Sequence, residues 1–343
     1  MSRTGWCLGL VVAIASVGAV GRAQAPPDQL PPGLLDKPAG GIHVGPADDT
    51  FTPDMPLPVR YDAGRFFVEP MTTNSGKMSF LTSTGDNNFI YSDAAGNLGV
   101  PILLDVADAS IFLPELKPGH RIPLSRGSGG VMRVQAKRLR RAYLDDECSG
   151  ILGHEWFAKR VWTLDYPAKT LRLRADSYTP PAAPKHRIPL RFRIGPRRQR
   201  MNNLPRISIK VAGESLDMLL QTGATVVLSY ATAKAIGDVR PVTRAASFVT
   251  RTRLEAWQKR HGWRVIDKAE RGGTGRMIEV PKVSIAGYDV GPVWFVAKPD
   301  RLYKTQLSRK LGAVIEGAVG GNLLRSFRIT LDYPGAQATF ETP

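Results

Sequence analysis

The chain has 343 residues, of which 43% are hydrophobic, and it contains 34 Gly and 27 Pro. This apolar content is too high for a disordered chain, and the many Gly and Pro are typical of a globular protein rich in turns. The formal net charge is +17. The basic clusters lack the interleaved aromatic residues or the known motif of a nucleic-acid-binding domain, so specific nucleic-acid binding is excluded from the predictions.

Residues 1–25 have the pattern of an export signal. Arg3 supplies a positive end, Trp6 to Val20 form an apolar run, and Ala23-Gln24-Ala25 offers small residues for cleavage. Cleavage after Ala23 and cleavage after Ala25 both stay open, because Pro26 is unfavourable directly after a cut. The run is short for a membrane span, so we favour an exported, periplasmic or secreted protein of bacterial type over an uncleaved N-terminal anchor.

Removal of the signal would take Cys7 and leave Cys148 as the single cysteine. The mature chain is then expected to have neither an internal disulfide nor a Cys-based metal site. His154-Glu155 has neither the spacing nor the third ligand of a metal site. We therefore predict no metal and no cofactor.

The elements that follow are short strands separated by turns. Residues 26–65, rich in Pro, Gly and Asp, indicate a loosely held arm, and strands are predicted at Lys77–Leu81 and Ile207–Leu220. An insertion at Ala245–Ile266 contains a predicted helix around Arg253–Arg260. Its Trp257 and the later Trp263 would line a cleft or cover the core, and we favour the core.

Basic residues gather in two segments, Lys137–Arg141 and Arg187–Arg206. The second segment includes a run of arginines at positions 191, 193, 197, 198 and 200. A solvated basic face is the simplest interpretation, and weak attraction to an anionic membrane or cell-wall surface is the alternative.

One short phrase occurs twice along the chain, at Phe80–Gly85 and at Met218–Gly223. Each copy is an apolar strand that runs into a tight X-Thr-Gly turn, and each follows a hairpin turn that contains Gly. Position X is Ser83 in the first copy and Gln221 in the second.

A second phrase follows each copy. Gly150-Ile151-Leu152-Gly153 precedes Leu-Asp-Tyr-Pro at 164–167, and Ala318-Val319-Gly320 precedes the same four residues at 331–334. Two phrases repeated in the same order predict two homologous lobes. We place these lobes at residues 66–176 and 206–343, joined by a basic, Pro-rich linker at 177–205.

From about residue 66 to the end, this layout resembles the retropepsin-like and pepsin-like aspartic peptidases, in the tandem two-lobe form found in bacteria. The resemblance implies a mostly β chain with two acid-protease β-barrel lobes and a central cleft. In the family, X is the catalytic Asp, and a hydrophobic-hydrophobic-Gly element supports it from below. The implied cleft residues are Thr84, Gly85, Thr222, Gly223 and Ala224. The implied supporting residues are Ile151, Leu152, Gly153, Ala318, Val319 and Gly320.

The family's chemistry needs two carboxylates that share one proton, so that one activates water and the other protonates the peptide carbonyl. The amide of Gln221 and the hydroxyl of Ser83 cannot exchange protons in this way. Each positioned acid or base contributes about 10²–10⁴-fold, so the loss of both predicts an inactive, neutral floor that still forms hydrogen bonds.

Three substitutes for the missing acids were considered. Asp86 follows Ser83 by three positions, but we expect the turn to aim it elsewhere. Ser83 as a nucleophile lacks the Gly-x-Ser-x-Gly elbow and an obvious partner among the five histidines, at 43, 120, 154, 186 and 261. Acids from a second chain are unnecessary because one chain supplies both lobes, so we expect a monomer. Asp165 and Asp332, in the repeated Leu-Asp-Tyr-Pro, are expected to be structural turn residues.

Two Gly-rich segments, Gly127–Gly130 and Gly272–Gly275, are interpreted equally as flaps over the cleft or as ordinary hairpin turns.

The first functional hypothesis is an exported, inactive peptidase-like protein that binds extended peptide, protein or another envelope ligand. The second is an active aspartic endopeptidase with displaced acids. The third is a structural envelope protein that binds anionic surfaces.

Overall fold

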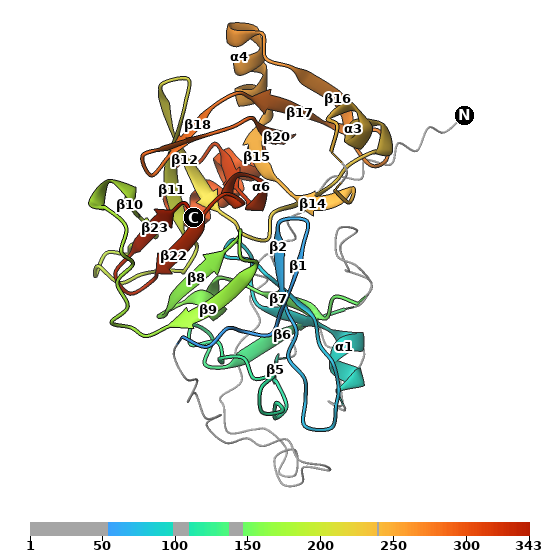
Figure 1. The fold of residues 1–343 in the computed structure, drawn as a ribbon, viewed down its shortest axis with the longest axis vertical. Coiled ribbons are helices and arrows are strands. Elements are labelled where there is room, and N and C mark those ends of the chain that lie inside the picture. Colours follow the sequence, from blue (N-terminus) through green and yellow to red (C-terminus); the bar gives the residue numbers. More distant parts are fainter. Residues whose placement is uncertain (1–53, 99–109, 137–146, 239) are drawn as a thin grey trace, which may run out of the picture. The chain divides into compact units, whose positions relative to one another are not determined.

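The computed structural model describes residues 54–98, 110–136, 147–238 and 240–343. The predicted signal, most of the N-terminal arm and the basic segment Lys137–Arg141 lie outside these residues. The chain is mostly β, as predicted, with four sheets of seven, five, nine and two strands in the described part (Figure 1). No helix within the described ranges is both long enough and apolar enough to span a bilayer.

The first half of the chain forms the seven-stranded sheet. Its order is β1 (Val59–Asp62), β2 (Arg65–Val68), β3 (Phe80–Thr82), β7 (Gly150–Leu152), β4 (Phe89–Tyr91), β6 (Val131–Gln135) and β5 (Ser110–Phe112). β7 lies between β3 and β4, parallel to β3 and antiparallel to β4. Two short helices, α1 (Ser92–Asn97) and α2 (His154–Phe157), follow β4 and β7.

The second half forms the nine-stranded sheet. Its order is β16 (Val265–Glu270), β17 (Thr274–Val280), β20 (Val293–Lys298), β15 (Ser247–Thr250), β21 (Gly317–Val319), β12 (Glu214–Leu220), β11 (Arg206–Val211), β18 (Val283–Ile285) and β19 (Tyr288–Val290). β21 is parallel to β12 and antiparallel to β15. The second half therefore repeats the β3-β7-β4 arrangement of the first half.

The remaining elements of the second half surround this sheet. β13 (Thr225–Val227) and β14 (Thr243–Ala245) pair with each other. The helices are α3 (Tyr230–Ala235), α4 (Arg251–His261), the π-helix η3 (Arg301–Leu307), α5 (Ser308–Leu311) and α6 (Gly321–Leu324).

The five-stranded sheet joins the two halves. Its order is β10 (Arg187–Pro189), β23 (Gln337–Glu341), β22 (Arg328–Asp332), β8 (Val161–Asp165) and β9 (Thr170–Arg174). β8 and β22, which carry the two Leu-Asp-Tyr-Pro repeats, pair antiparallel and lie side by side in Figure 1. β10 follows the short helix η2 (Pro184–His186), so the segment predicted as a linker contributes a strand to this sheet.

The predicted helix in the insertion is α4. Thr250 caps its start by accepting a hydrogen bond from the Arg253 backbone, and Gly262 ends it in the left-handed conformation with φ 65°. Leu254 and Trp257 are buried, with 0% and 1% of their surface exposed. Trp257 packs against Phe295 at a centroid distance of 5.9 Å, so the preferred interpretation of this residue as core is confirmed.

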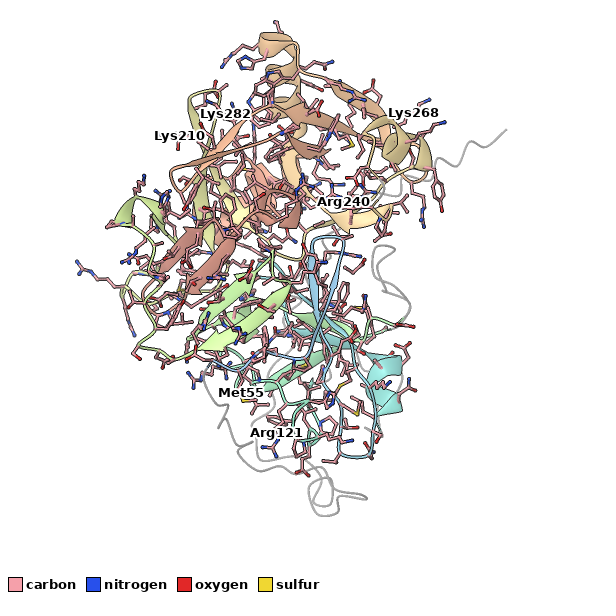
Figure 2. The ribbon with its side chains drawn as sticks, viewed as in Figure 1. Met55, Arg121, Lys210, Arg240, Lys268 and Lys282 are labelled. Carbon is pink, nitrogen blue, oxygen red and sulfur yellow. The ribbon has the colours of Figure 1, made fainter. Side chains whose placement is uncertain are left out.

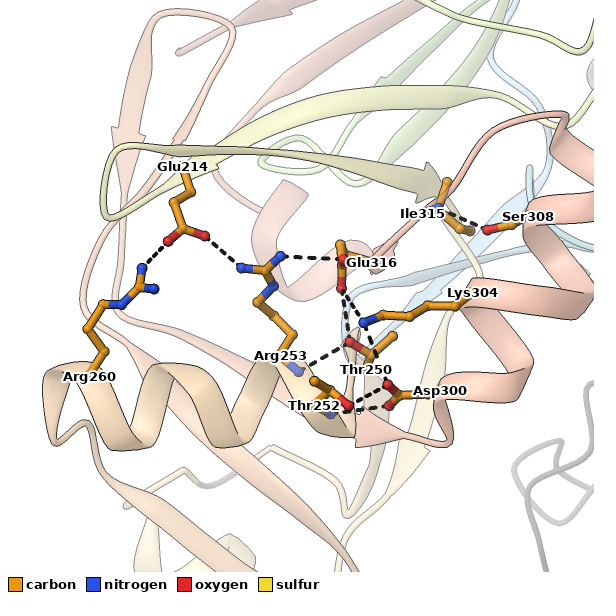
Figure 3. A network of polar contacts seen from close by, with 10 residues as sticks. All are labelled: Glu214, Thr250, Thr252, Arg253, Arg260, Asp300, Lys304, Ser308, Ile315 and Glu316. Carbon is orange, nitrogen blue, oxygen red and sulfur yellow. Dashed lines mark hydrogen bonds and ion pairs between the residues drawn. The ribbon is translucent and has the colours of Figure 1, made fainter.

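A network of charged side chains holds α4 against its neighbours (Figure 3). Arg253 donates to Glu214, at the turn between β11 and β12, over 2.6 Å and lies 3.4 Å from Glu316. Lys304 of η3 lies 3.8 Å from Glu316 and 3.6 Å from Asp300. Exposed ion pairs are individually worth about 0–1 kcal/mol, but this network links α4, β12 and η3, and η3 carries a residue of the candidate site.

Candidate functional site

The two Thr-Gly loops meet and hold each other by reciprocal hydrogen bonds. Thr84 Oγ1 donates to the Leu220 carbonyl at 2.6 Å, and Thr222 Oγ1 donates to the Thr82 carbonyl at 3.4 Å. The backbone N–H of each threonine also donates to the hydroxyl of the other, both at 3.2 Å. Four hydrogen bonds between buried groups fix the separation of the two loops.

The glycine of each loop packs against residue X of the other loop. A Cβ on Gly85 would lie 2.6 Å from Gln221 Cγ, and a Cβ on Gly223 would lie 2.5 Å from Ser83 Cβ. Any larger residue would push Ser83 and Gln221 apart. Both glycines, both X residues, both threonines and Ala224 are buried.

Asp86 lies between the two X residues, so the expectation that the turn would aim it elsewhere is wrong. Its Oδ2 accepts a hydrogen bond from Ser83 Oγ at 2.7 Å and another from Gln221 Nε2 at 3.0 Å. Asp86 is 6% exposed. The floor therefore carries a carboxylate, contrary to the expectation of a neutral floor, and Ser83 and Gln221 both act as its donors.

The position of Asp86 depends on a contact far away in the sequence. Its backbone carbonyl accepts a hydrogen bond from the His154 N–H at 2.8 Å, just after the Ile-Leu-Gly element. A Cβ on Gly153 would lie 2.1 Å from the same carbonyl oxygen. The bare glycine thus lets the end of β7 lie directly under the turn that carries Asp86.

The supporting elements hold both loops in the same way. The Ser83 N–H donates to the Leu152 carbonyl, and the Gln221 N–H donates to the Val319 carbonyl, both at 2.9 Å. Ile151 and Ala318 lie in β7 and β21, paired with Leu81 and Leu219. Gly320 packs against the Ala246 carbonyl, where a Cβ would lie only 2.0 Å from the oxygen.

Tyr303 of η3 is a neighbour of this site that sequence reasoning missed. Burial raises the pKa of the Tyr303 hydroxyl far above its ordinary value, and the nearby Asp86 charge raises it further. The phenol therefore stays protonated and neutral at all ordinary pH. Its sequence surroundings resemble any amphipathic helical turn, so no local signal marks it.

Ser83 is not part of a Ser-His pair in the described residues. Its hydroxyl contacts Asp86, whereas His154 Nε2 lies 3.1 Å from Asn87 Oδ1 and His154 Nδ1 lies 3.1 Å from Glu155 Oε1. The contact with His154 lowers the pKa of Glu155. Neither Ser83 nor Gln221 contacts a second carboxylate among the described residues. The site therefore offers one carboxylate with two donors rather than a proton-sharing pair.

The other candidate acids have structural partners. Asp165 accepts a hydrogen bond from Arg328 Nε at 2.7 Å, and Asp332 accepts one from the Gly335 N–H at 2.7 Å. No group of three His, Cys, Asp or Glu suited to a metal ion occurs in the ranges that the structure describes.

The Gly-rich segments both form turns. Gly272 and Gly273 form the tight turn between β16 and β17, with φ values of 87° and 72°. Gly127–Gly130 forms the turn before β6, where Ser128 Oγ donates to the Val131 carbonyl at 2.7 Å. A role as flaps remains a prediction for both.

The basic segment is not uniformly a solvated face. Arg197 and Arg198 are exposed, but Arg200 lies 3.7 Å above the Phe192 ring and donates to the Tyr333 carbonyl at 2.8 Å. Other exposed lysines of the second half include Lys210, near the end of β11, and Lys282, between β17 and β18 (Figure 2). Arg200 is therefore a packing residue rather than surface charge.

Comparison with known proteins gives similarity in structure alone. No family model and no curated protein sequence matches the chain. An aspartic proteinase from Irpex lacteus is similar at 10% identity with a TM-score of 0.44, over 84% of this chain and 97% of that structure. The crystal structure of edgp is similar at 13% identity with a TM-score of 0.41, over 85% and 95%.

Proposed function

We propose that this chain is an aspartic-peptidase-like protein that binds an extended peptide segment between its two halves and does not cleave it. The observation that carries the proposal is the carboxylate of Asp86, whose Oδ2 accepts from both Ser83 and Gln221 and which is the one acid that these two residues contact within the described ranges. Peptide hydrolysis by this fold needs one carboxylate as base and a second, protonated one as acid. Neither neighbour of Asp86 can supply the second function, because an amide and an unactivated hydroxyl do not exchange protons near neutral pH.

The loops that would bind a peptide persist without this chemistry. Extended peptides are held largely through backbone hydrogen bonds to strand edges, which do not depend on catalytic acids. The reciprocal Thr84 and Thr222 contacts keep the loops in register. We propose Thr84, Gly85, Thr222, Gly223 and Ala224 as the floor under the ligand.

One observation favours the second candidate, an active endopeptidase with displaced acids. Asp86 lies between the positions where the resemblance places the catalytic pair. Under this candidate Asp86 would activate water directly, and a group brought by the substrate would protonate the leaving nitrogen.

A single experiment separates the two candidates. Purified protein is incubated with a mixed peptide library in acidic and in neutral buffer, and both new chain ends and retained peptides are identified by mass spectrometry. We expect saturable retention of peptides without new chain ends. We expect Asp86→Asn to weaken this binding by about fivefold or more, because a charge-assisted hydrogen bond is lost. Asp267→Asn, at a carboxylate whose side chain is 72% exposed on β16, serves as the matched control and should leave the affinity unchanged.

Cleavage that disappears in Asp86→Asn would establish the second candidate instead. Neither retention nor cleavage would favour the third, a structural envelope protein that binds anionic surfaces. For that candidate, Arg197 and Arg198 are the arginines to neutralise, since Arg200 packs on Phe192.

We also propose export to the periplasm or the medium, which the leader pattern of residues 1–25 supports. N-terminal sequencing of the protein recovered from the cell envelope or the medium would test this. Recovery of the intact N-terminus in the membrane fraction would show the uncleaved anchor.

A further inference from the structure

A cavity in the second half combines converging arginines with an apolar wall. The wall comes from β13, β17 and β20 and includes Val226, Met277 and Trp294. Arg240, Arg244 and Arg325 line the same cavity together with Asp238. Three guanidinium groups therefore face one carboxylate.

The single carboxylate is already used by two of the arginines. Arg240 Nε lies 2.9 Å from Asp238 Oδ1, and Arg244 Nη1 lies 2.9 Å from Asp238 Oδ2. Arg244 is 4% exposed, and its Nη1 makes no hydrogen bond of good geometry within the described residues. Positive charge thus remains uncompensated in a partly desolvated place.

Arg325, at the end of α6, is the arginine left over. In the described part of the chain it has neither an ion pair nor a hydrogen bond, although it lines the cavity. Partial desolvation lowers the pKa of Arg325, and repulsion from the nearby Arg240 lowers it further. Arg325 is exposed, and because Arg240 repels it, Arg325 would gain more from a bound anion than an isolated surface arginine would.

The size of the cavity limits what can bind. The cavity volume is about 50 Å³. On the same measure a single water molecule needs about 10–15 Å³, so the cavity has room for a group of a few heavy atoms. One side opens to solvent, so the rest of a ligand can extend outward.

We propose that this cavity binds a compact oxyanion, a carboxylate or phosphate, carried on a short apolar stem, with Arg325 and Arg240 as its ligands and the β13–β20 wall against the stem. This site is independent of peptide binding at the Thr-Gly loops. Asp238 orders Arg240 and Arg244 in the absence of ligand, and Arg325 supplies the contact that forms on binding.

The test measures binding of four probes to the purified protein by titration calorimetry. 3-Methylbutanoate and 3-methylbutyl phosphate carry the same stem on the two oxyanions, 3-methylbutanamide is the uncharged counterpart, and inorganic phosphate has no stem. We expect one or both stem-bearing oxyanions to bind saturably, and the amide and inorganic phosphate to bind at least about tenfold more weakly. The tighter of the two stem-bearing probes identifies the natural head group.

Arg325→Gln should weaken the binding by about tenfold or more, because a charge-assisted contact is lost while no internal ion pair is disturbed. Lys210→Gln removes one positive charge from an exposed position of β11 that does not line this cavity and should leave the affinity unchanged. The proposal is overturned if neither oxyanion binds, if the amide binds equally, if inorganic phosphate binds as tightly as the stem-bearing probes, or if Arg325→Gln binds like the unchanged protein.

Discussion

The position of Asp86 opposite residue 221 makes a specific prediction about Gln221→Asp. In the unchanged protein, Gln221 Nε2 donates to Asp86 Oδ2 at 3.0 Å. Because Asp is one methylene shorter than Gln, the two carboxylates of the variant would lie about 4–5 Å apart. Two unit charges at that separation repel by about 3–4 kcal/mol at an effective dielectric constant of about 20.

The variant can avoid this repulsion only by keeping one proton between the two carboxyl groups. Their shared proton raises the pKa of the pair above that of an Asp in the unfolded chain, about 3.9. The folded variant then binds more protons than the unfolded variant, so its stability falls as the pH rises. The penalty should be absent below about pH 4 and should approach about 3–4 kcal/mol near neutrality.

Urea denaturation across the acidic to neutral range measures this profile. Gln221→Asn is the matched control, since it shortens the side chain by the same methylene but adds no charge. The difference between the Asp and Asn variants isolates the repulsion. Equal stability of the two variants at every pH would show that Asp86 does not face position 221, and the description of the site would then be wrong.

Three further changes test the surroundings of the site. Lys298→Met should cost about 3 kcal/mol because it leaves Glu270 without its buried partner, whereas the double variant with Glu270→Gln should recover most of this in a denaturation experiment. Burial lowers the pKa of Lys298, so between that pKa and about 10.5 the unfolded protein binds more protons than the folded protein. The stability of the unchanged protein should therefore rise with pH in this alkaline range, and the double variant should lose this rise. Gly153→Ala should cost about 3 kcal/mol or more because its Cβ would overlap a backbone oxygen. Its control, Gly96→Ala, lies in a helix with open space around it and should stabilise by about 0.5–1 kcal/mol. Equal melting temperatures of these two variants would contradict the packing described. Thr84→Val removes both hydrogen bonds of its hydroxyl and should cost about 2–4 kcal/mol, and Thr84→Ser should restore most of the lost midpoint.

The fold class and helix α4 could be predicted from the sequence, because both depend on patterns among neighbouring residues. The mostly β class followed from short apolar runs and frequent turns, and the structure confirms it. The helix predicted around Arg253–Arg260 is α4, and Trp257, predicted to cover the core, lies on its buried side. These features could be predicted because the residues that determine them are neighbours in the chain.

Contacts between distant segments explain what the sequence did not predict. Asp86 points into the floor because the His154 N–H and the bare Gly153 fix its backbone from 67 or more positions away. The same holds for the contact of Arg200 with the Tyr333 carbonyl and for the strand β10, which needs β23 as its partner. None of these contacts can be recognised from the sequence of a few neighbouring residues.

Ser83, Gln221 and Asp86 form a matched set. Two facing acids that share one proton carry one net negative charge. The Asp86 carboxylate carries the same charge, and Ser83 and Gln221 both donate hydrogen bonds to it. A second acid at position 221 would face Asp86 and repel it. A carboxylate that only accepts hydrogen bonds cannot protonate a peptide carbonyl, but it favours an N–H or a cationic side chain of a ligand. We therefore expect peptides retained by this protein to place a donor over Asp86, where a substrate of the peptidases it resembles would place the carbonyl to be cleaved.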